Sequence, residues 1–334
     1  MNILLTSVGR RSYLIKYFKQ VSDVGSVHVS NSEETVAFHY ADKSVVTPMI
    51  YDDGYIPFLL DYCKKNEIKI LLSLFDIDLP VLAENKDKFE QIDVKLIVSD
   101  KKVIDICNDK WKTYEFLKEN GFNVPKTYLK LEEVMASLKA GELSYPIIIK
   151  PRFGCGSLAM STAEDEDELM YYYKRNVRAV NRTYLKYESG AVEEKIIFQE
   201  KLGGQEYGVD IINDLNGNFV NAVVKKKIAM RAGETDISET VNEPAVFEAA
   251  KRLGQLTGHI ANMDCDVFLV DGKAYVLEMN ARFGGGYPFS HIAGVNLPEA
   301  IVNWVNGKDV SDESLTAKCG VKAFKEIEIK QVGD

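Results

Sequence analysis

The sequence predicts an α/β protein that begins with a doubly wound parallel sheet and continues into a separate second unit. In the first hundred residues, short apolar runs alternate with amphipathic stretches, and the connections between them are short. Such alternation is typical of βα units that form a parallel sheet with helices on both faces. A helical run over residues 110–120, closed by Gly121 and followed by Pro125, marks a new unit that begins near Asp109.

Five strands and three helices make up the predicted first domain, residues 1–108. The strands are expected at residues 2–7, 26–30, 44–47, 68–74 and 94–98, and the helices at residues 13–18, 55–66 and 79–88. Ligands of such sheets bind at the carboxyl ends of the strands. The segment TSVGRRS after the first strand lacks the dinucleotide fingerprint GxGxxG, and the chain lacks the Walker pattern GxxxxGK[ST]. A typical Rossmann oxidoreductase and a P-loop enzyme are therefore excluded.

The second unit is expected to cover residues 109–310, with a C-terminal segment over 311–334. Its strands are expected at residues 145–150, 196–200, 207–213 and 219–226 and in a hairpin over 265–279; its helices are expected at residues 110–120, 165–187, 244–258 and 298–306. The helix over 165–187 has an acidic start and a basic, tyrosine-rich end, which the helix dipole favours. We expect it to be a solvated lid helix, with contact to substrate or to a partner subunit as the alternative.

The composition of the chain argues against several classes of function. The formal net charge of -9 argues against a protein that coats nucleic acid through bulk positive charge. No apolar run approaches the roughly 18–20 residues that a membrane span requires. The five cysteines are scattered without a CxxC pair, so neither a disulfide framework nor a zinc cluster is expected. We therefore expect a cytoplasmic enzyme without nucleic-acid or membrane partners.

The strand over 145–150 ends in Lys150 and continues into Pro151 and the small-residue loop RFGCGS. Small residues such as Gly154, Gly156 and Ser157 let a backbone close over phosphate groups and present N–H donors, while a lysine supplies a positive charge. This pattern predicts a phosphate-binding loop, and a plain Gly-x-Gly turn between two strands is the alternative.

A second candidate site follows the strand over 196–200, where the chain continues as EKLGGQE. A strand end followed by a glycine turn exposes backbone groups that could meet the flat edge of a base. Glu206 could then accept hydrogen bonds from a ribose. An ordinary strand–loop–strand connection is the alternative.

The predicted hairpin carries the strongest signal. Glu278 and Asn280 are two residues apart, so they share one face of a strand, where oxygen ligands suit Mg²⁺ together with substrate phosphates and water. Asp266 joins them if the hairpin has a three-residue loop with a bulge. A two-residue turn at Asp271-Gly272 would instead pair Asp266 with Leu277, on the opposite face. The metal hypothesis therefore requires the longer loop, and a surface hairpin with solvated acids is the alternative.

In this order, the three features resemble the ATP-grasp superfamily, whose members bind Mg-ATP between two α+β subdomains. The resemblance covers nearly the whole chain and implies an α/β domain before an ATP-grasp domain of two α+β subdomains, with a lid subdomain over about 125–198. It implies that phosphates are contacted by Lys110 and Lys150, under a mobile loop of Gly154, Gly156 and Ser157. It implies that the hinge at adenine consists of Glu200, Lys201 and Leu202, with Glu206 at the ribose. It also implies that the metal is bound by Asp266, Glu278 and Asn280.

Two arginines complete the site that the resemblance implies. Arg282 matches an arginine of the reaction centre, and Arg231, in the segment MRAGET, lies where such ligases contact substrate or phosphate. No general base is evident, because His259 and His291 are expected to be core or loop residues.

Within this superfamily, the chain resembles the carbamoyl phosphate synthase large chain and single-module carboxylate–amine ligases related to it. The chain departs from the synthase because 334 residues hold one grasp module instead of two, and because Asp266 stands where synthase modules often have Gln. The resemblance implies an ADP-forming ligase that joins a small-molecule carboxylate, with an amino acid as one candidate, to an amine through an acylphosphate. ATP with Mg²⁺ or Mn²⁺ would be the cofactors, and a homodimer is the assembly that the fold suggests by analogy.

Two other functions stay open. An enzyme of carbamoyl-phosphate-synthase type would activate bicarbonate or carbamate, and a regulatory module would bind the nucleotide without turnover. The complete set of lysines and metal ligands argues against the regulatory module.

Overall fold

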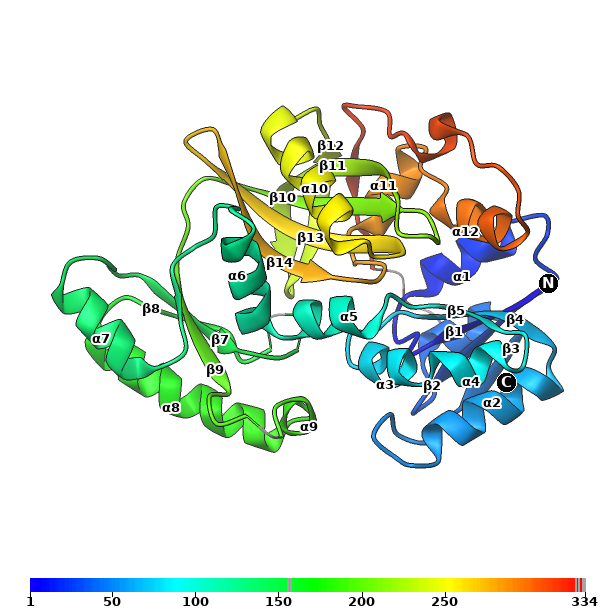
Figure 1. The fold of residues 1–334 in the computed structure, drawn as a ribbon, viewed down its shortest axis with the longest axis horizontal. Helices are drawn as coiled ribbons and strands as arrows, with labels where there is room; N and C mark the ends of the chain where they lie inside the picture. The colour runs from blue at the N-terminus through cyan, green and yellow to red at the C-terminus, as the bar shows by residue number, and fades with distance from the viewer. Residues whose placement is uncertain (155, 157, 191, 328, 330, 332–334) are drawn as a thin grey trace.

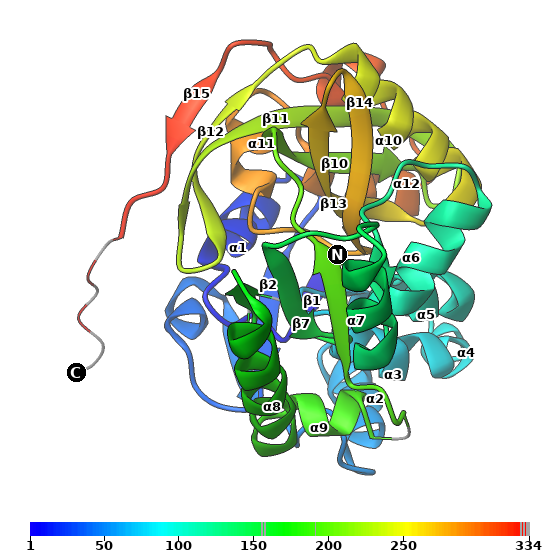
Figure 2. The same cartoon turned by 90° about the vertical axis from the view of Figure 1, so that its left-hand side faces the viewer.

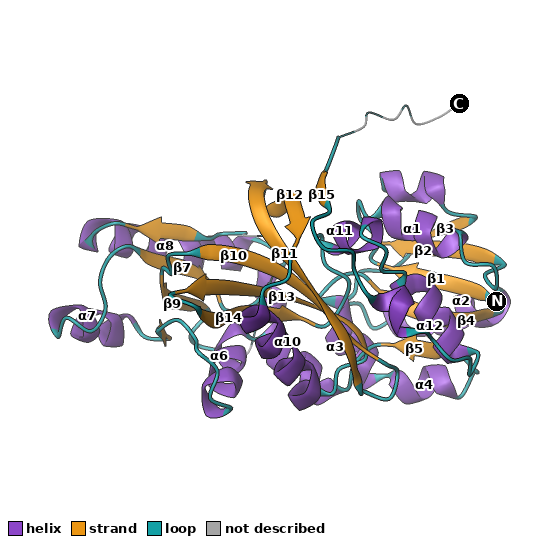
Figure 3. Ribbon diagram, turned by 90° about the horizontal axis from the view of Figure 1, so that it is seen from above, coloured by secondary structure: helices purple, strands orange, loops and turns teal. Residues whose placement is uncertain are grey.

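Three β-sheets organise the computed structural model, which describes residues 1–154, 156, 158–190, 192–327, 329 and 331. Ser157, expected in the phosphate-binding loop, lies outside the described residues. Figure 1 shows the five-stranded N-terminal sheet at one end of the molecule and a small four-stranded sheet at the other. Seen from above, the six-stranded sheet lies between them (Figure 3).

The N-terminal sheet is parallel, with the strand order β3-β2-β1-β4-β5. Its strands are β1 (Asn2–Thr6), β2 (Ser26–Asn31), β3 (Lys43–Val46), β4 (Ile68–Ser73) and β5 (Lys95–Ile97). Alternate residues of β1 enter different apolar clusters: Ile3 and Leu5 join the cluster of α1, whereas Leu4 joins that of α2. Helices thus cover both faces, which confirms the doubly wound fold.

The helices of this domain are α1 (Ser12–Lys19), the 3₁₀-helix η1 (Val36–Tyr40), α2 (Tyr55–Lys65), α3 (Asp78–Glu84), α4 (Lys86–Glu90) and α5 (Lys101–Asn108). The helix expected over residues 79–88 is interrupted at Asn85. Sequence patterns did not indicate α5, whose buried residues Val103, Ile104 and Cys107 form a short apolar stripe.

The central six-stranded sheet is antiparallel, in the order β14-β13-β10-β11-β12-β15. Its strands are β10 (Gln205–Asn213), β11 (Phe219–Arg231), β12 (Glu234–Thr240), β13 (Ala261–Val270), β14 (Lys273–Asn280) and β15 (Lys322–Phe324). Helices α6 (Lys110–Glu119) and α10 (Pro244–Thr257) contact this sheet. Proline at the start of α10 and left-handed Gly258 at its end fix the limits of that helix.

The small sheet has the order β6-β9-β7-β8. It consists of β6 (Thr127–Tyr128), β7 (Ile147–Pro151), β8 (Ser161–Ala163) and β9 (Ile196–Glu200), together with α7 (Leu131–Lys139), α8 (Glu166–Arg182) and α9 (Leu185–Glu188). The single helix expected over residues 165–187 is thus two helices, because the extended residue Thr183 ends α8. We call the described residues of 125–198 the lid, while its limits and those of the other domains stay predictions.

The C-terminal part of the chain contacts both the N-terminal domain and the central sheet. Helices α11 (Tyr287–Ile292) and α12 (Leu297–Val305) and the 3₁₀-helix η2 (Asp312–Leu315) precede β15. Helix α12 packs against α1, and β15 lies at the edge of the central sheet beside β12 (Figure 2). Among the described residues, no helix has the length and apolar character that crossing a membrane demands.

Candidate active site

A β-bulge at Leu277 brings the three expected metal ligands to one face of the hairpin. The turn is the tight one, with Val270 paired to Lys273 around Asp271-Gly272. The prediction that this turn would move Asp266 to the opposite face is wrong, because the register shifts within the strand and pairs Asp266 directly with Glu278. Bulges often re-aim side chains beside active sites in this way.

The register then extends this polar face across the central sheet. Lys225, Gly208, Asp266 and Glu278 form one row over four neighbouring strands. Asp210, Asp264 and Asn280 follow in the next row, so charged side chains alternate along the strands. One face of the central sheet therefore forms the charged floor of a cleft, while its other face packs on helices.

A cavity of about 570 Å³ lies between the lid and this floor. We call it the lysine cavity. Every described residue that was expected at the nucleotide lines it, namely Lys110, Lys150, Gly154, Gly156, Glu200, Lys201, Leu202 and Glu206. Apolar side chains such as Phe153, Met160 and Phe268 complete its wall. The cavity combines apolar side chains with cations, among them Lys110 and Lys150, and this combination suits a base and a polyphosphate.

Local interactions position the two lysines. Asp109 caps α6 through the Trp111 N–H and accepts two hydrogen bonds of 2.7 Å from Arg152, which holds Lys110 beside the end of β7. Lys150 on β7 is only 6% exposed, and burial lowers its pKa to about 8. A buried ammonium group without a close carboxylate gains from the arrival of a phosphate.

The turn at Gly154 requires glycine. Its φ is +92°, and a Cβ atom there would lie 2.3 Å from the Leu185 side chain of α9. The Lys110 ammonium group donates a hydrogen bond to the Gly154 carbonyl oxygen. The glycine therefore lets the loop pass between the lid helix and the lysine that it covers.

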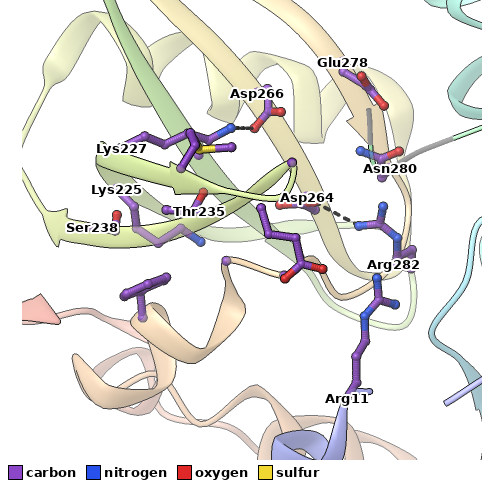
Figure 4. Close-up of a pocket in the computed structure, with 18 of the residues that line it drawn as sticks. Arg11, Lys225, Lys227, Thr235, Ser238, Asp264, Asp266, Glu278, Asn280 and Arg282 are labelled. Carbon is purple, nitrogen blue, oxygen red and sulfur yellow. Dashed lines mark hydrogen bonds and ion pairs between the residues drawn. The ribbon is translucent and has the colours of Figure 1, made fainter. Parts of the chain in front are cut away.

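A second cavity, of about 500 Å³, opens beside the first. We call it the arginine cavity, since Arg11 and Arg282 line it (Figure 4). The two cavities share a wall that consists of Gly156, Leu158, Lys227, Met230, Gly233, Asp266 and Glu278. A phosphoryl group that ends at this shared wall would face whatever molecule occupies the arginine cavity.

Arg282 is held between the hairpin and the N-terminal domain. Its Nε and Nη2 donate to Asp76 Oδ2 at 3.1 and 2.8 Å, and its Nη1 donates to Asp264 Oδ2 at 2.9 Å. Asp264 and Arg282 line the arginine cavity, and Arg282 is 8% exposed. Two carboxylates on different domains thus fix the plane of the guanidinium group.

Two lysines of β11 belong to the site and were not predicted. Lys227 pairs with Glu206 and Asp266 at 2.6 Å each, and these carboxylates raise its pKa although burial opposes the shift. Lys225 is 2% exposed and pairs with Asp210. The signal was available, since two lysines with period-2 spacing in the apolar strand VVKKK place long cations on one face.

Arg231 is not brought to either cavity. Its guanidinium group pairs with Asp236 and donates to the Lys325 carbonyl oxygen at 3.0 Å, beside β15. His259 is fully buried, with Nε2 donating to the Ile211 carbonyl oxygen at 3.0 Å, and His291 stacks on Tyr17. Arg282 is therefore the expected catalytic arginine that the cleft contains.

The hairpin residues fit a magnesium ion that arrives with a nucleotide. Among the described residues, no group of three or more His, Cys, Asp or Glu side chains is placed to hold a metal by itself. Mg²⁺ commonly takes one or two protein carboxylates and completes its shell with phosphates and water. Asp266 and Glu278 supply two carboxylates, and burial raises the pKa of Asp266 to about 6 even though Lys227 opposes the shift. Lys227 therefore does not fully balance the negative charge of Asp266 and Glu278, and a bound metal cation would balance the remainder.

Comparison with known proteins identifies the family. Residues 107–286 match the ATP-grasp domain, and residues 3–97 match the PylC-like N-terminal domain. Because the first match covers more than half of the chain, the protein belongs to the ATP-grasp family. The chain is 22% identical to the carbamoyl phosphate synthase large chain of Clostridium beijerinckii, over 96% of this chain and 29% of that protein. It therefore spans less than a third of the length of this relative.

Solved structures show the same fold. Biotin carboxylase of Campylobacter jejuni superimposes with a TM-score of 0.73 at 18% identity, over 95% of this chain and 73% of that chain. The L-amino acid ligase of Bacillus licheniformis superimposes with a TM-score of 0.66 at 19% identity, over 91% and 75% of the two chains. Identities this low establish a common fold, and the chemistry must be argued from the site.

Proposed function

We propose that the protein is an ATP-dependent, ADP-forming carboxylate–amine ligase that makes an amide bond through an acylphosphate, with an amino acid as the first candidate substrate. The observation that carries this proposal is the wall shared by the lysine and arginine cavities, which bears Asp266 and Glu278. It puts a candidate site for the last phosphoryl group of a nucleotide next to a second, charged cavity.

The lysine cavity would hold ATP. Leu202 and Phe268 offer an apolar surface to adenine, Glu206 is available to the ribose, and Lys110 and Lys150 face the phosphates. Asp266, Glu278 and Asn280 would hold Mg²⁺, which neutralises phosphate charge when bound. Phosphoryl transfer depends mainly on positioning and charge neutralisation, and these side chains provide both.

The arginine cavity would hold the carboxylate. A carboxylate oxygen attacks the γ-phosphorus, the bond to the bridging oxygen breaks, and ADP leaves. The amine nitrogen then attacks the acyl carbon, the carbon–oxygen bond to phosphate breaks, and the amine proton passes to the departing phosphate or to water. Arg282 would stabilise the negative charge that develops on the acyl oxygens, because its orientation is fixed before the reaction starts.

The size of the arginine cavity favours an organic substrate over bicarbonate. Its volume of about 500 Å³ lies within the range of small-molecule sites, whereas a three-oxygen anion would fill a small fraction of it. One structural neighbour is an L-amino acid ligase, which also supports an amino acid.

The test measures ADP release by a coupled assay over a panel of carboxylates and amines, with bicarbonate as a separate arm. Carboxylates labelled with ¹⁸O should transfer one labelled oxygen to the released phosphate, and mass spectrometry should detect the amide. ADP release that depends on bicarbonate would favour carbamoyl-phosphate-type chemistry. Nucleotide binding without any turnover would refute the ligase.

A further inference from the structure

The charge balance of the arginine cavity is uneven. Four basic side chains line it, and three of them have carboxylate partners: Lys225 with Asp210, Lys227 with Glu206 and Asp266, and Arg282 with Asp76 and Asp264. Within the described part of the chain, the fourth, Arg11, makes no ion pair or hydrogen bond through its guanidinium group. Figure 4 shows its side chain pointing from the start of α1 toward Arg282.

None of the described acids that line the cavity forms a direct ion pair with Arg11. Asp264 and Asp266 are bound to Arg282 and Lys227, Glu234 is bound to Lys325 at 2.9 Å, and Glu278 lies 3.9 Å from Lys110. Each carboxylate that lines the cavity thus has a cation other than Arg11 within 4.0 Å. Burial opposes the change, but Lys325 and then Arg11 lower the pKa of Glu234, so Arg11 acts on Glu234 without contacting it. A guanidinium group that faces a cavity without a carboxylate in direct contact gains most when a ligand supplies one.

The loop that carries Arg11 is fixed in advance. Ser7 has a left-handed φ of 51°, which few residues other than glycine adopt, and its hydroxyl group donates to Asp78 at 3.0 Å. The Val8 N–H donates to the Ser30 carbonyl oxygen at 3.3 Å, and the Arg11 N–H donates to the Val8 carbonyl oxygen at 3.0 Å. The backbone therefore places Arg11 without help from its side chain.

Among the described residues, no hydrogen bond, ion pair or ring contact gives the side chain of Arg11 a structural task. Arg11 occupies the N-cap of α1, where Ser, Thr, Asp or Asn is favoured, and it makes no side-chain cap. Its neighbour Arg10 is exposed and does not line the cavity. Two adjacent arginines thus differ in exposure, and one of them faces the substrate cavity.

We infer that Arg11 binds a carboxylate of the substrate that does not itself react. This inference rests on the proposed function and adds a substrate class to it: one of the two joined molecules carries an extra carboxylate. Arg11 does not line the lysine cavity or the shared wall, so neither the nucleotide phosphates nor the carboxylate being phosphorylated is its expected ligand. The planar fork of arginine matches a carboxylate through two parallel hydrogen bonds.

The experiment compares substrates with and without the extra carboxylate, in the full-length protein with Mg-ATP. In the amine arm, lysine is compared with 1,5-diaminopentane; in the acid arm, glutamate is compared with 4-aminobutyrate. We expect wild-type protein to prefer the compound with the extra carboxylate in one arm, by about 10- to 100-fold in kcat/KM, the range of a charge-assisted pair. The arm that shows the preference identifies the molecule that Arg11 holds.

Three variants complete the test. Arg11→Gln should raise KM for the preferred substrate by about 10- to 100-fold and remove the preference, with KM for ATP unchanged. Arg11→Lys should lie between the two, because it keeps the charge but loses the fork. Arg10→Gln is the matched control and should behave as wild type. Thermal stabilisation by MgADP confirms that each variant is folded.

The outcomes separate the two levels of the proposal. If wild-type protein releases no ADP with any pair of substrates, the proposed function fails and the inference fails with it. If wild-type protein turns over but ignores the extra carboxylate in both arms, or if Arg11→Gln keeps the wild-type KM, the inference is overturned while the ligase stands. A loss of kcat at unchanged KM would also overturn it, since Arg11 would then act at the reaction centre.

Discussion

The two cavities of the cleft are built in different ways. The lysine cavity takes most of its polar residues from short continuous segments, at the start of α6, at the end of β7 and after β9. The arginine cavity collects single residues from many places: Arg11 before α1, Phe75 after β4, Lys225 on β11, and Arg282 after β14. A binding site for a common nucleotide can be recognised in local motifs, whereas a site for a particular substrate depends on the assembled fold.

The cavities also differ in how their charges are balanced. In the lysine cavity, Lys150 is buried and forms no ion pair with any described carboxylate, and burial lowers its pKa. In the arginine cavity, carboxylates hold Arg282 and Lys225 in place before any ligand binds. The lysine cavity therefore has positive charge that a bound polyanion would balance. In the arginine cavity, ion pairs fix the orientation of the basic side chains before a ligand binds, and Arg11, which forms no such pair with a described residue, is the exception. The predictions below test this contrast.

Substitutions in the wall that the two cavities share should have the largest effect on activity. Glu278→Gln removes a carboxylate from the expected metal ligands, and we expect Mg-dependent ADP release to fall by about 10³-fold, or roughly 4 kcal/mol in transition-state stabilisation. Steady-state ADP release, measured over a range of Mg²⁺ concentrations, checks this.

The control for this variant lies on the same hairpin. Asp271 is an exposed acid at the turn with φ of 49°, and Asp271→Asn keeps a residue type that tolerates this conformation. It should retain wild-type activity and wild-type thermal stability. Wild-type rates in Glu278→Gln would refute the metal assignment, and loss of folding in that variant would show a structural role instead.

The second prediction concerns the link between Arg282 and the N-terminal domain. Asp76→Asn keeps an oxygen that can accept from Arg282 but removes the charge that fixes the guanidinium group, while Asp264 remains as a partner. We expect kcat to fall by about 10- to 100-fold through misplacement of Arg282, with KM for ATP changed less than about twofold. Initial rates over both substrates and the midpoint of thermal unfolding separate positioning from folding. An equal rise in KM for ATP would contradict this role.

The contrast between the cavities also explains what the sequence could predict. Strand–helix alternation predicted the parallel sheet, since each buried strand must be apolar and each helix amphipathic. Lys150, Gly154 and Glu200 could be selected because they stand beside strand ends in short motifs. The Asp76–Arg282 contact joins residues 206 positions apart, and no local pattern records such a pair.

Three further features were missed for physical reasons. Strand β12 is polar, with the sequence ETDISET, so pairing with β11 defines it more than apolar periodicity does. The bulge at Leu277 lies within β14, away from the turn, so the residue types at the turn do not reveal it. Arg11 stands in a segment whose single glycine excluded a dinucleotide fingerprint but did not suggest an alternative function.

The third prediction uses the titration of Lys150. Its pKa is lowered to about 8 in the free protein, and a bound phosphate favours the charged form, so nucleotide binding should be coupled to proton uptake above pH 8. Affinity for MgADP should therefore fall by about tenfold between pH 7 and pH 9, and calorimetry in buffers of different ionisation enthalpy should show uptake of nearly one proton at pH 9.

Lys150→Arg is the matched variant for this measurement. Arginine stays charged throughout the range, so the variant should lose the pH dependence whatever its absolute affinity. The same pH dependence in both proteins would assign the titration to another group. It would also break the contrast between the buried Lys150 and the carboxylate-paired cations of the arginine cavity.

The smallest effect is expected where the lid meets the N-terminal domain, at the rim of the arginine cavity. The Tyr51 hydroxyl group donates to Glu188 Oε1 at 2.5 Å, the Tyr51 ring stacks on Tyr187 with centroids 4.7 Å apart, and Tyr184 meets Phe75 edge to face. Tyr51 is 36% exposed and Tyr187 is 52% exposed, so solvent weakens this contact. It joins α9 to the opposite side of the cleft, and closure of the lid would preserve an acylphosphate by excluding water.

Tyr51→Phe removes the hydrogen bond and keeps the stacked ring, and Tyr51→Ala removes both. We expect KM for the carboxylate substrate, which would occupy the arginine cavity, to rise by about twofold to fivefold in Tyr51→Phe and further in Tyr51→Ala. The ratio of phosphate released to amide formed should rise in the same order, because a looser lid admits water to the intermediate. A constant ratio in both variants would show that this contact plays no part in protecting the intermediate.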